Sequence, residues 1–330
     1  MPEGGSNAPM TRYIIRRLLW MVLVLLVVVF ISFVIFFLMP SGDPAVRFAG
    51  KGAQPQVLET VRQQLGLDRP WWSQYFSFTR NIFLGDEYGW PGLGFSFSTR
   101  VPLREIIFER MWVTIQLAVG AAVIWLLVGI PIGILSALRP RSALDRSAMT
   151  FALIGISAPV FFLGPLALYI FWYKLGWLPG TGYYPLSDGF GPWFSHFILP
   201  WSVLAVLYAA FYARMTRANL LETMGEDYIR TARAKGLSER RVVLKHGLRA
   251  GLTPIVTIFG LDLAGLLGGA IITETIFNIP GIGQYTIKAV RGLDLYAIMD
   301  ITLIVAFFVT FANLVVDIVY AFLDPRVRYD

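Results

Sequence analysis

Six long apolar runs constrain this chain more than any other feature. The first run alone forms a helix about 33 Å long, which is enough to cross the hydrocarbon core of a bilayer. With 56% hydrophobic residues, 15% charged residues and a mean hydropathy of +0.62, the chain is too apolar for an ordinary soluble globular protein. The sequence therefore predicts an all-α integral membrane protein with six transmembrane helices. These are expected at Leu18–Met39, Met111–Leu138, Met149–Tyr173, Phe197–Tyr212, Ile255–Thr273 and Ile301–Leu323.

The first apolar run follows a small N-terminal arm that ends in Arg12, Arg16 and Arg17. Basic residues before an apolar run also describe a cleavable signal peptide. The run Leu18–Met39 is longer than the apolar part of a signal peptide, and no Ala-x-Ala-like cleavage site follows it. We interpret it as an uncleaved first span.

The distribution of basic residues predicts the orientation of the spans. Of the 28 Lys and Arg residues, most lie at the two termini, in the loop 139–148 and around the stretch 226–254, all on one side of a six-span topology. The short loops of the other side carry only Lys174, Lys288 and Arg291. By the positive-inside rule, both termini are expected in the cytoplasm.

A long segment, Pro40–Arg110, is expected on the outer side. It contains an amphipathic helix around Gln56–Leu65 and then a dense group of aromatic residues, which we interpret as an interfacial belt rather than a core. The belt consists of Trp71, Trp72, Tyr75, Phe76 and Phe78. The chain is thereby divided into residues 1–40 (arm and first span), 41–110 (outer segment) and 111–330 (five-helix core).

The stretch Glu226–Pro254 is a long polar segment between two spans, and its charges are mostly basic. Apolar residues recur in it at helical spacing, and Gly236 divides it in two. We expect a first helix that ends at Gly236 in a left-handed conformation and a second that opens with Ser238 as N-cap and Glu239 in its first turn. On charge alone, a solvated loop held by lipid head groups is the favoured interpretation, and the exact residues of the stretch change this weighing.

The residues that catalysis usually requires are absent in recognisable patterns. The chain has no cysteine, and its two histidines, His196 and His246, are expected on opposite sides of the membrane, so they cannot share a metal ion. No H-E-x-x-H, G-x-S-x-G or G-x-x-x-x-G-K-[ST] motif occurs in the sequence. A membrane enzyme and a nucleotide-binding protein are therefore both disfavoured.

Three acidic residues, Asp262, Asp300 and Asp317, lie at or near membrane depth. Acids at this depth are candidates for function because they are costly to expose to lipid. For Asp317 we favour a packing role, since Asn313 and Tyr320 are close to it on the same expected helix.

Asp262 is expected on a helical face with three small residues that allow close approach of another helix. These are Gly265, Gly269 and Thr273. The pattern predicts either a lining of a translocation path or a contact with a sister subunit.

The stretch 226–254 resembles the EAA loop of ABC-importer permease subunits, in the variant of the dipeptide and oligopeptide permease family. Gly236 sets the register, and the run Tyr228–Leu237, YIRTARAKGL, matches the variant, although the leading Glu and the closing Pro of the general EAA pattern are missing. Other segments resemble the same family in the same order: YIIRRLLW, LMPSGDPA, LGLDRPWWSQY, GAIITETIFNIPGIGQ and NLVVDIVYAFLDPRVR. The stretch Gly85–Ser98 also departs from the family pattern, so the outer surface is expected to differ there.

This resemblance implies a type I ABC importer permease fold in a prokaryotic inner membrane. It implies as partners a second permease subunit, two ABC ATPase subunits and an external solute-binding protein, with peptide as substrate and no nucleic acid. The chain would bind no cofactor itself, and ATP and Mg²⁺ would be used by the ATPase subunits. Ala232, Gly236 and Leu237 would supply small and apolar contacts to the ATPase. The residues expected to couple to the ATPase are Tyr228, Arg230, Thr231, Ala232, Arg233, Ala234, Lys235, Gly236, Leu237 and Glu239.

Two alternatives remain open from the sequence. Relatives of this family carry nickel chelates, glutathione or oligosaccharides, so the solute is not determined. A proton-coupled secondary carrier would use Asp262 or Asp317, but it would normally show two similar halves, and we find no internal repeat.

Overall fold

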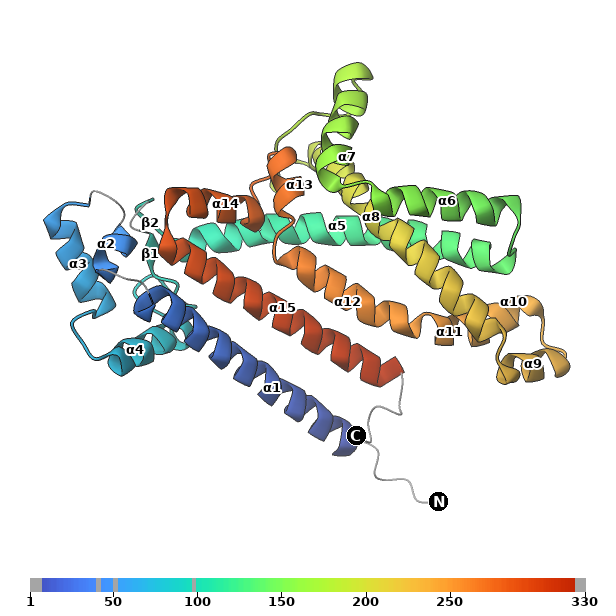
Figure 1. The fold of residues 1–330 in the computed structure, drawn as a ribbon, viewed down its shortest axis with the longest axis horizontal. Coiled ribbons are helices and arrows are strands. Elements are labelled where there is room, and N and C mark those ends of the chain that lie inside the picture. Colours follow the sequence, from blue (N-terminus) through green and yellow to red (C-terminus); the bar gives the residue numbers. More distant parts are fainter. Residues whose placement is uncertain (1–7, 40–42, 50–52, 97–98, 324–330) are drawn as a thin grey trace.

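The computed structural model describes residues 8–39, 43–49, 53–96 and 99–323 of the chain. Residues 1–7 of the expected N-terminal arm, the closing residues 324–330 and parts of the LMPSGDPA and Gly85–Ser98 segments lie outside this description. Almost all of the described chain that has regular structure is helical, which confirms the all-α prediction (Figure 1).

In the described part, four helices are long and apolar enough to cross a membrane, and two bent pairs raise the number to six if each pair is one span. The four are α1 (Ala8–Phe33, continued by a π-helical turn over Val34–Leu38), α5 (Leu103–Leu138), α8 (Phe190–Met224) and α15 (Leu295–Leu323). The first bent pair is α6 (Ala143–Ser157) with α7 (Val160–Ala167) and a π-helical turn over Leu168–Lys174. The second is α10 (Glu239–Arg241), a π-helical turn over Val242–Gly247 and α11 (Leu248–Gly251), with α12 (Thr253–Leu267).

The expected single span Met149–Tyr173 is bent by 102° between α6 and α7. Pro159 causes the break, because a residue before proline avoids helical angles. Ala158 is accordingly extended, with φ −89° and ψ 112°. The apolar run was recognised correctly, and the break within it lies at one of the prolines that interrupt the run.

Several other expected boundaries are wrong. The run Phe197–Tyr212 marks only the middle of α8, which continues through polar residues to Met224, and α5 and α15 begin before Met111 and Ile301. Hydropathy reports contact with lipid, whereas a helix continues wherever its backbone hydrogen bonds are made. The fifth span ends before the expected Thr273. Helix α12 stops at Leu267, and Gly269 just beyond it has a positive φ of 111°, which does not continue a helix.

Helices α5 and α8 form the centre of the molecule. Small residues let them approach closely: a Cβ on Gly129 would lie 2.8 Å from the Ala209 carbonyl oxygen, and one on Gly133 would lie 2.5 Å from that of Ala213. Trp125 fills the core beside them and stacks on Tyr208 at 4.5 Å between ring centroids. Helices α6, α7 and α12 pack against α5 and α8.

The long segment gathers at one end of the molecule, at the left of Figure 1. It contains α2 (Pro44–Ala49), α3 (Pro55–Leu65), α4 (Trp71–Leu84) and a small antiparallel pair, β1 (Phe95–Ser96) and β2 (Val101–Pro102). Helix α3 confirms the predicted amphipathic helix.

The interpretation of the aromatic group as a belt is only partly right. Trp71, Trp72 and Phe76 are exposed, as a belt requires. Tyr75 and Phe78 instead pack against Phe33 of α1, with ring centroids 5.4 and 6.1 Å away. The sequence pattern could not separate the two sets because they alternate on one short helix.

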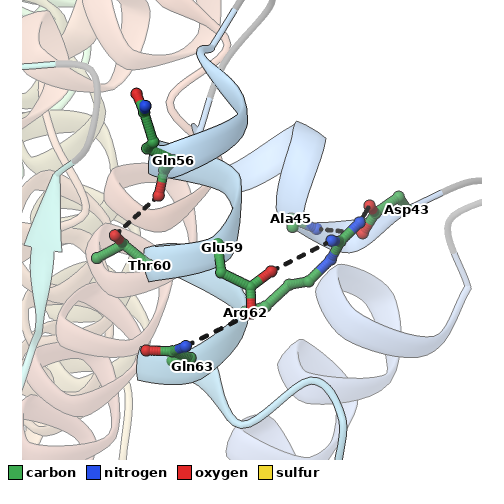
Figure 2. A network of polar contacts seen from close by, with 7 residues as sticks. All are labelled: Asp43, Ala45, Gln56, Glu59, Thr60, Arg62 and Gln63. Carbon is green, nitrogen blue, oxygen red and sulfur yellow. Dashed lines mark hydrogen bonds and ion pairs between the residues drawn. The ribbon is translucent and has the colours of Figure 1, made fainter.

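Polar contacts fasten α2 to α3, as Figure 2 shows. The Arg62 side chain donates a hydrogen bond to the Asp43 carboxylate and lies 3.6 Å from a Glu59 carboxylate oxygen. Asp43 also accepts a hydrogen bond from the Ala45 backbone N–H at 2.9 Å. These contacts hold the pKa of Asp43 below its usual value, chiefly through the hydrogen bond from Arg62.

The remaining elements are α9 (Asp227–Ala234), α13 (Ile271–Ile276), α14 (Ile282–Gly292) and a 3₁₀ turn over Leu186–Asp188. Helix α14 and the long segment lie at one end, whereas α9, α10 and α11 lie at the opposite end (Figure 1). The start of α1 and the end of α15 point toward the same end as α9.

Candidate functional site

Helix α9 and the break after it form the candidate site. The backbone N–H of Gly236 donates to the Arg233 carbonyl at 2.9 Å, and that of Leu237 donates to the Ala232 carbonyl at 3.4 Å. Gly236 has φ +75°, as predicted, and a Cβ at this position would meet nothing within 4 Å. Glycine is needed here for its backbone conformation and not for space.

One face of α9 is packed inward. Ile229 is fully buried and Ala232 is nearly so, and both contact Val242, which follows the break. Met224 and Leu237 close this small cluster. The region is thus a hairpin with its own apolar centre and not a loose loop, although Ser238, at the expected N-cap, makes no capping hydrogen bond with its side chain.

The inward position of Ala232 changes the expected role of that residue. We had expected Ala232 and Leu237 to supply the small and apolar contacts of an outward surface, yet Ala232 is buried and Leu237 is half-buried against the hairpin's own core. The other face of α9 and the break remain exposed. This outer face of α9 consists of Tyr228, Arg230, Thr231, Arg233, Ala234, Lys235 and Gly236.

Ion pairs brace the hairpin. The Arg233 guanidinium makes two hydrogen bonds to Glu239 across the break, from Nε at 3.1 Å and from Nη2 at 2.7 Å. Arg230 lies 3.3 Å from Asp227 on the same helix. Glu239 therefore joins the two sides of the turn in addition to lying on the exposed surface. All four side chains are exposed, so each pair contributes little to stability.

A buried ion pair at the base of the hairpin was missed by the sequence analysis. Asp145 of α6 is 3% exposed and accepts two hydrogen bonds from Arg217 of α8, at 2.6 and 2.8 Å. The Ser136 hydroxyl of α5 donates to the same carboxylate, as does the backbone N–H of Arg141 at 2.8 Å. Three helices therefore meet on one acid, just before α8 leads into α9. The feature of the sequence that could have indicated this ion pair is the position of Asp145 within an Arg-rich loop.

The structure separates the residues expected to share a face with Asp262. Asp262 lies on α12, half-buried, and accepts a hydrogen bond from the Tyr212 hydroxyl at 2.8 Å. Gly265 lies one turn later with open space at its Cβ position. The prediction that Gly269 and Thr273 continue this face is wrong, because α12 ends at Leu267.

Gly269 and Thr273 have structural positions instead. A Cβ on Gly269 would lie 2.8 Å from the Gly283 Cα, so the backbone of α14 approaches it directly. Thr273 belongs to α13 and is 1% exposed. Next to it, Glu274 is fully buried and accepts hydrogen bonds from the Thr114 hydroxyl at 2.7 Å and the Gln284 backbone N–H at 2.8 Å. Sequence analysis missed this buried acid as well.

The structure also shows where Asp317 and Asp300, the two other acids expected near membrane depth, are located. Asp317 forms an ion pair with Arg17 at 2.9 Å and so ties α15 to α1, which agrees with the packing role predicted for it. The Tyr320 side chain, proposed as a neighbour, lies outside the described residues. Asp300 is 1% exposed near the start of α15 and borders a small cavity beneath the long segment together with Asp86.

Within the described ranges, no group of three or more His, Asp or Glu side chains is arranged to hold a metal ion. His196 lies near the start of α8 and His246 in the hairpin at the other end of the molecule. The geometry therefore offers a packed hairpin with an exposed polar face, fixed to a bundle of apolar helices.

A family model described as "Binding-protein-dependent transport system inner membrane component" matches residues 129–329. A second model, for the N-terminal part of such membrane components, matches residues 10–118. The chain belongs to the family of binding-protein-dependent transport permeases. It is a permease subunit that spans the membrane several times, and the resemblance seen in the sequence is confirmed.

Curated relatives cover the permease almost from end to end. A probable peptide ABC transporter permease of Sinorhizobium fredii is 38% identical over 96% of this chain and 99% of its own. A putative peptide transport system permease of Brucella abortus is 40% identical over 97% of this chain and 100% of its own. The glutathione transport system permease GsiC of Escherichia coli is 41% identical over the same shares.

Among solved structures, the permease is similar to a chain of the MetNI methionine ABC transporter in an inward-facing conformation. The TM-score is 0.55 with 19% identity, over 68% of this chain and 98% of that one. The likeness supports the fold alone and confirms the importer permease architecture.

Proposed function

We propose that this permease imports di- and oligopeptides as half of the translocation pathway of an ATP-driven, binding-protein-dependent importer. A second permease subunit would complete the pathway, two ABC ATPase subunits would bind on the side of the hairpin, and an external binding protein would deliver the solute. The chain itself would need no cofactor. ATP and Mg²⁺ would act in the ATPase subunits.

One observation carries the coupling part of the proposal. Helix α9 has a buried face and an exposed face, so it is a preformed, rigid unit that can lie in a groove of another protein. Because its buried face packs against Val242, a push on α9 is passed to the chain that enters α12. The Asp145–Arg217 pair fixes the other end of the hairpin to α5, α6 and α8. Closure of the ATPase subunits would then move the bundle as a rigid body.

The side of the hairpin is proposed to be cytoplasmic, which places both termini there as well. The support is the gathering of basic residues at this end, in keeping with the positive-inside rule. The long segment at the opposite end would then face the binding protein.

The peptide substrate rests on the printed names of the Sinorhizobium and Brucella relatives. Glutathione is the second candidate, since the Escherichia coli relative is named for it. Nickel chelates and oligosaccharides remain further alternatives, and a proton-coupled carrier is the competing mechanism.

Asp262 is proposed to face the pathway or the second permease subunit. A carboxylate that faces hydrocarbon costs about 2.5 kcal/mol or more at the bilayer centre, and the open space beside Gly265 leaves room for solute or for another helix. Asp262→Leu should alter uptake or assembly, whereas Leu261→Ala on the adjacent exposed position should not. Unchanged uptake and unchanged pairing in Asp262→Leu would remove the support for this role.

The experiment that tests the function is reconstitution of the permease with its partner subunits in proteoliposomes. We expect ATP hydrolysis and uptake to be stimulated by a peptide library delivered by the binding protein, and competing glutathione, nickel chelate and oligosaccharide to identify the solute. Uptake that follows a proton gradient without an ATPase subunit would support the carrier instead.

A further inference from the structure

A cavity of about 260 Å³ lies between α1, α4, α5 and α15, at the end of the molecule that carries the long segment. Every residue that lines it is apolar; among them are Val28, Phe83, Trp90, Phe108, Leu303 and Phe307. Water has no polar partner in such a space and does not fill it. The occupant must therefore be apolar.

The cavity is accessible from the surface that contacts lipid. Phe83, Phe108 and Phe307 are 44%, 41% and 40% exposed although they line it. On α1, the neighbouring Leu26 and Val27 are also exposed. Because Leu26, Val27, Phe108 and Phe307 belong to candidate spans, the medium that surrounds them is the bilayer.

The cavity reaches deep into the membrane-spanning part of the molecule. Leu25, its deepest residue on α1, lies roughly 20 Å from the end of the span at Leu38, as the helical rise gives. Half of a typical hydrocarbon core is about 15 Å thick. Trp90 and Phe108 mark the other end of the cavity, next to the long segment. On α1 the cavity thus lies at about the middle of the bilayer.

A cation is held at the interfacial end. Arg104 Nε donates a hydrogen bond to the Trp90 carbonyl oxygen at 2.8 Å, and its guanidinium carbon lies 6.0 Å from the centre of the Phe108 ring. Both of these residues line the cavity. Within the described part of the chain, no carboxylate lies within ion-pair distance of Arg104. Its Nη groups remain able to bind a phosphate, which a guanidinium recognises well.

We propose that this cavity binds an acyl chain of one phospholipid, in the leaflet next to the long segment, with the lipid phosphate on Arg104. The chain would fill the gap between α1 and α15 below α4 and would so fasten the long segment to the spans. A hydrocarbon chain fits the lining, and a phosphate fits the charge at its end.

The test uses the whole importer, purified, stripped of lipid and titrated with two lipids that have the same acyl chains, phosphatidylglycerol and diacylglycerol. Native mass spectrometry counts the molecules bound. For the parent we expect one phosphatidylglycerol, bound at least tenfold more tightly than diacylglycerol. Val28→Phe, which fills the cavity, should bind neither, and Val24→Phe, on the exposed surface of the same helix, should bind as the parent does.

Arg104→Gln separates the two parts of the site and keeps the test valid if Val28→Phe does not assemble. We expect this variant to bind the two lipids with similar affinity, while Arg100→Gln, at an exposed arginine nearby, keeps the preference. Undiminished binding in Val28→Phe, or an unchanged preference in Arg104→Gln, would overturn the proposal. A parent complex that binds neither lipid, because the second permease subunit fills the cavity, would overturn it too.

Discussion

Asp145 is the residue on which three helices meet, since it accepts hydrogen bonds from α5 and α8 while it belongs to α6. Removal of one partner of a buried ion pair leaves the other charge without compensation, which costs about 3 kcal/mol or more. We therefore expect Asp145→Asn to lower the thermal unfolding temperature of the purified permease strongly. Arg146→Gln, at an exposed position on the same helix, should change it little. Equal melting of the two variants would show that the pair does not hold the bundle.

Asp43 makes a contact with Arg62 whose contribution to stability depends on pH. Its folded-state pKa lies below the ordinary value of 3.8 because Arg62 donates to its charged form, so the contact stabilises α2 on α3 at all pH values above about 3.8. As pH falls through the lower folded-state pKa, the carboxylate is protonated and the contribution is lost. Hydrogen exchange of Pro44–Ala49, corrected for intrinsic rates, should stay constant between about pH 7 and pH 5 and rise only in strong acid. Asp43→Asn should show no such transition, and a loss of protection already above about pH 5 would contradict this account.

For single residues, the sequence predicted only features that depend on neighbouring positions in the chain. The positive φ of Gly236 follows from its place at the end of one short helix, and the structure has it. The contact between Asp145 and Arg217 joins residues far apart in the sequence, and nothing near either one indicates the other. Glu274 was overlooked for the same reason, because its partners Thr114 and Gln284 come from two other helices.

Among the elements, the turn at Gly236 has the clearest consequence for coupling. Valine at φ +75° is strained by about 1–3 kcal/mol, while the space at the Cβ position is open, so Gly236→Val should change the backbone and not the packing. We expect normal membrane insertion, weaker association with the ATPase subunits and loss of solute-dependent ATP hydrolysis. Gly236→Asn, which tolerates this conformation better, should be mild.

Gly247→Ala is a poor control for this variant, although the sequence suggests that alanine would be harmless in a helix. Its Cβ would lie 3.0 Å from the Met224 sulfur and 3.3 Å from a Leu220 methyl carbon. Full transport by Gly236→Val, with ATPase subunits bound as in the parent, would return the hairpin to the alternative of a solvated surface loop.

The helices also show which features a sequence pattern predicts and which it does not. The amphipathic run at Gln56–Leu65 and the six apolar runs were found because periodicity and hydropathy are properties of adjacent residues. Hydropathy does not mark the 102° bend at Pro159 or the end of α12 at Leu267, because the apolar runs continue through both. A membrane helix with proline can continue, as α8 does through Pro200, or break, and the sequence alone does not decide between them.

On the scale of the whole molecule, the polar parts of the chain are separated to its two ends. The long segment, with its small β-pair, lies at one end, and the hairpin that holds α9 lies at the other (Figure 1). An importer needs this separation, because solute is delivered on one side of the membrane and ATP is used on the other. We propose that the outer face of α9 is the surface that meets the ATPase subunits.

Site-directed cross-linking from single cysteines tests this claim most directly, because the chain has no cysteine of its own. Thr231→Cys places a probe on the outer face of α9, and Ser187→Cys places one on the exposed 3₁₀ turn before α8. In an active complex labelled with a benzophenone maleimide, Thr231→Cys should form an adduct with an ATPase subunit after illumination, and Ser187→Cys should form none. An ATPase adduct from Ser187→Cys, or none from Thr231→Cys, would contradict the account.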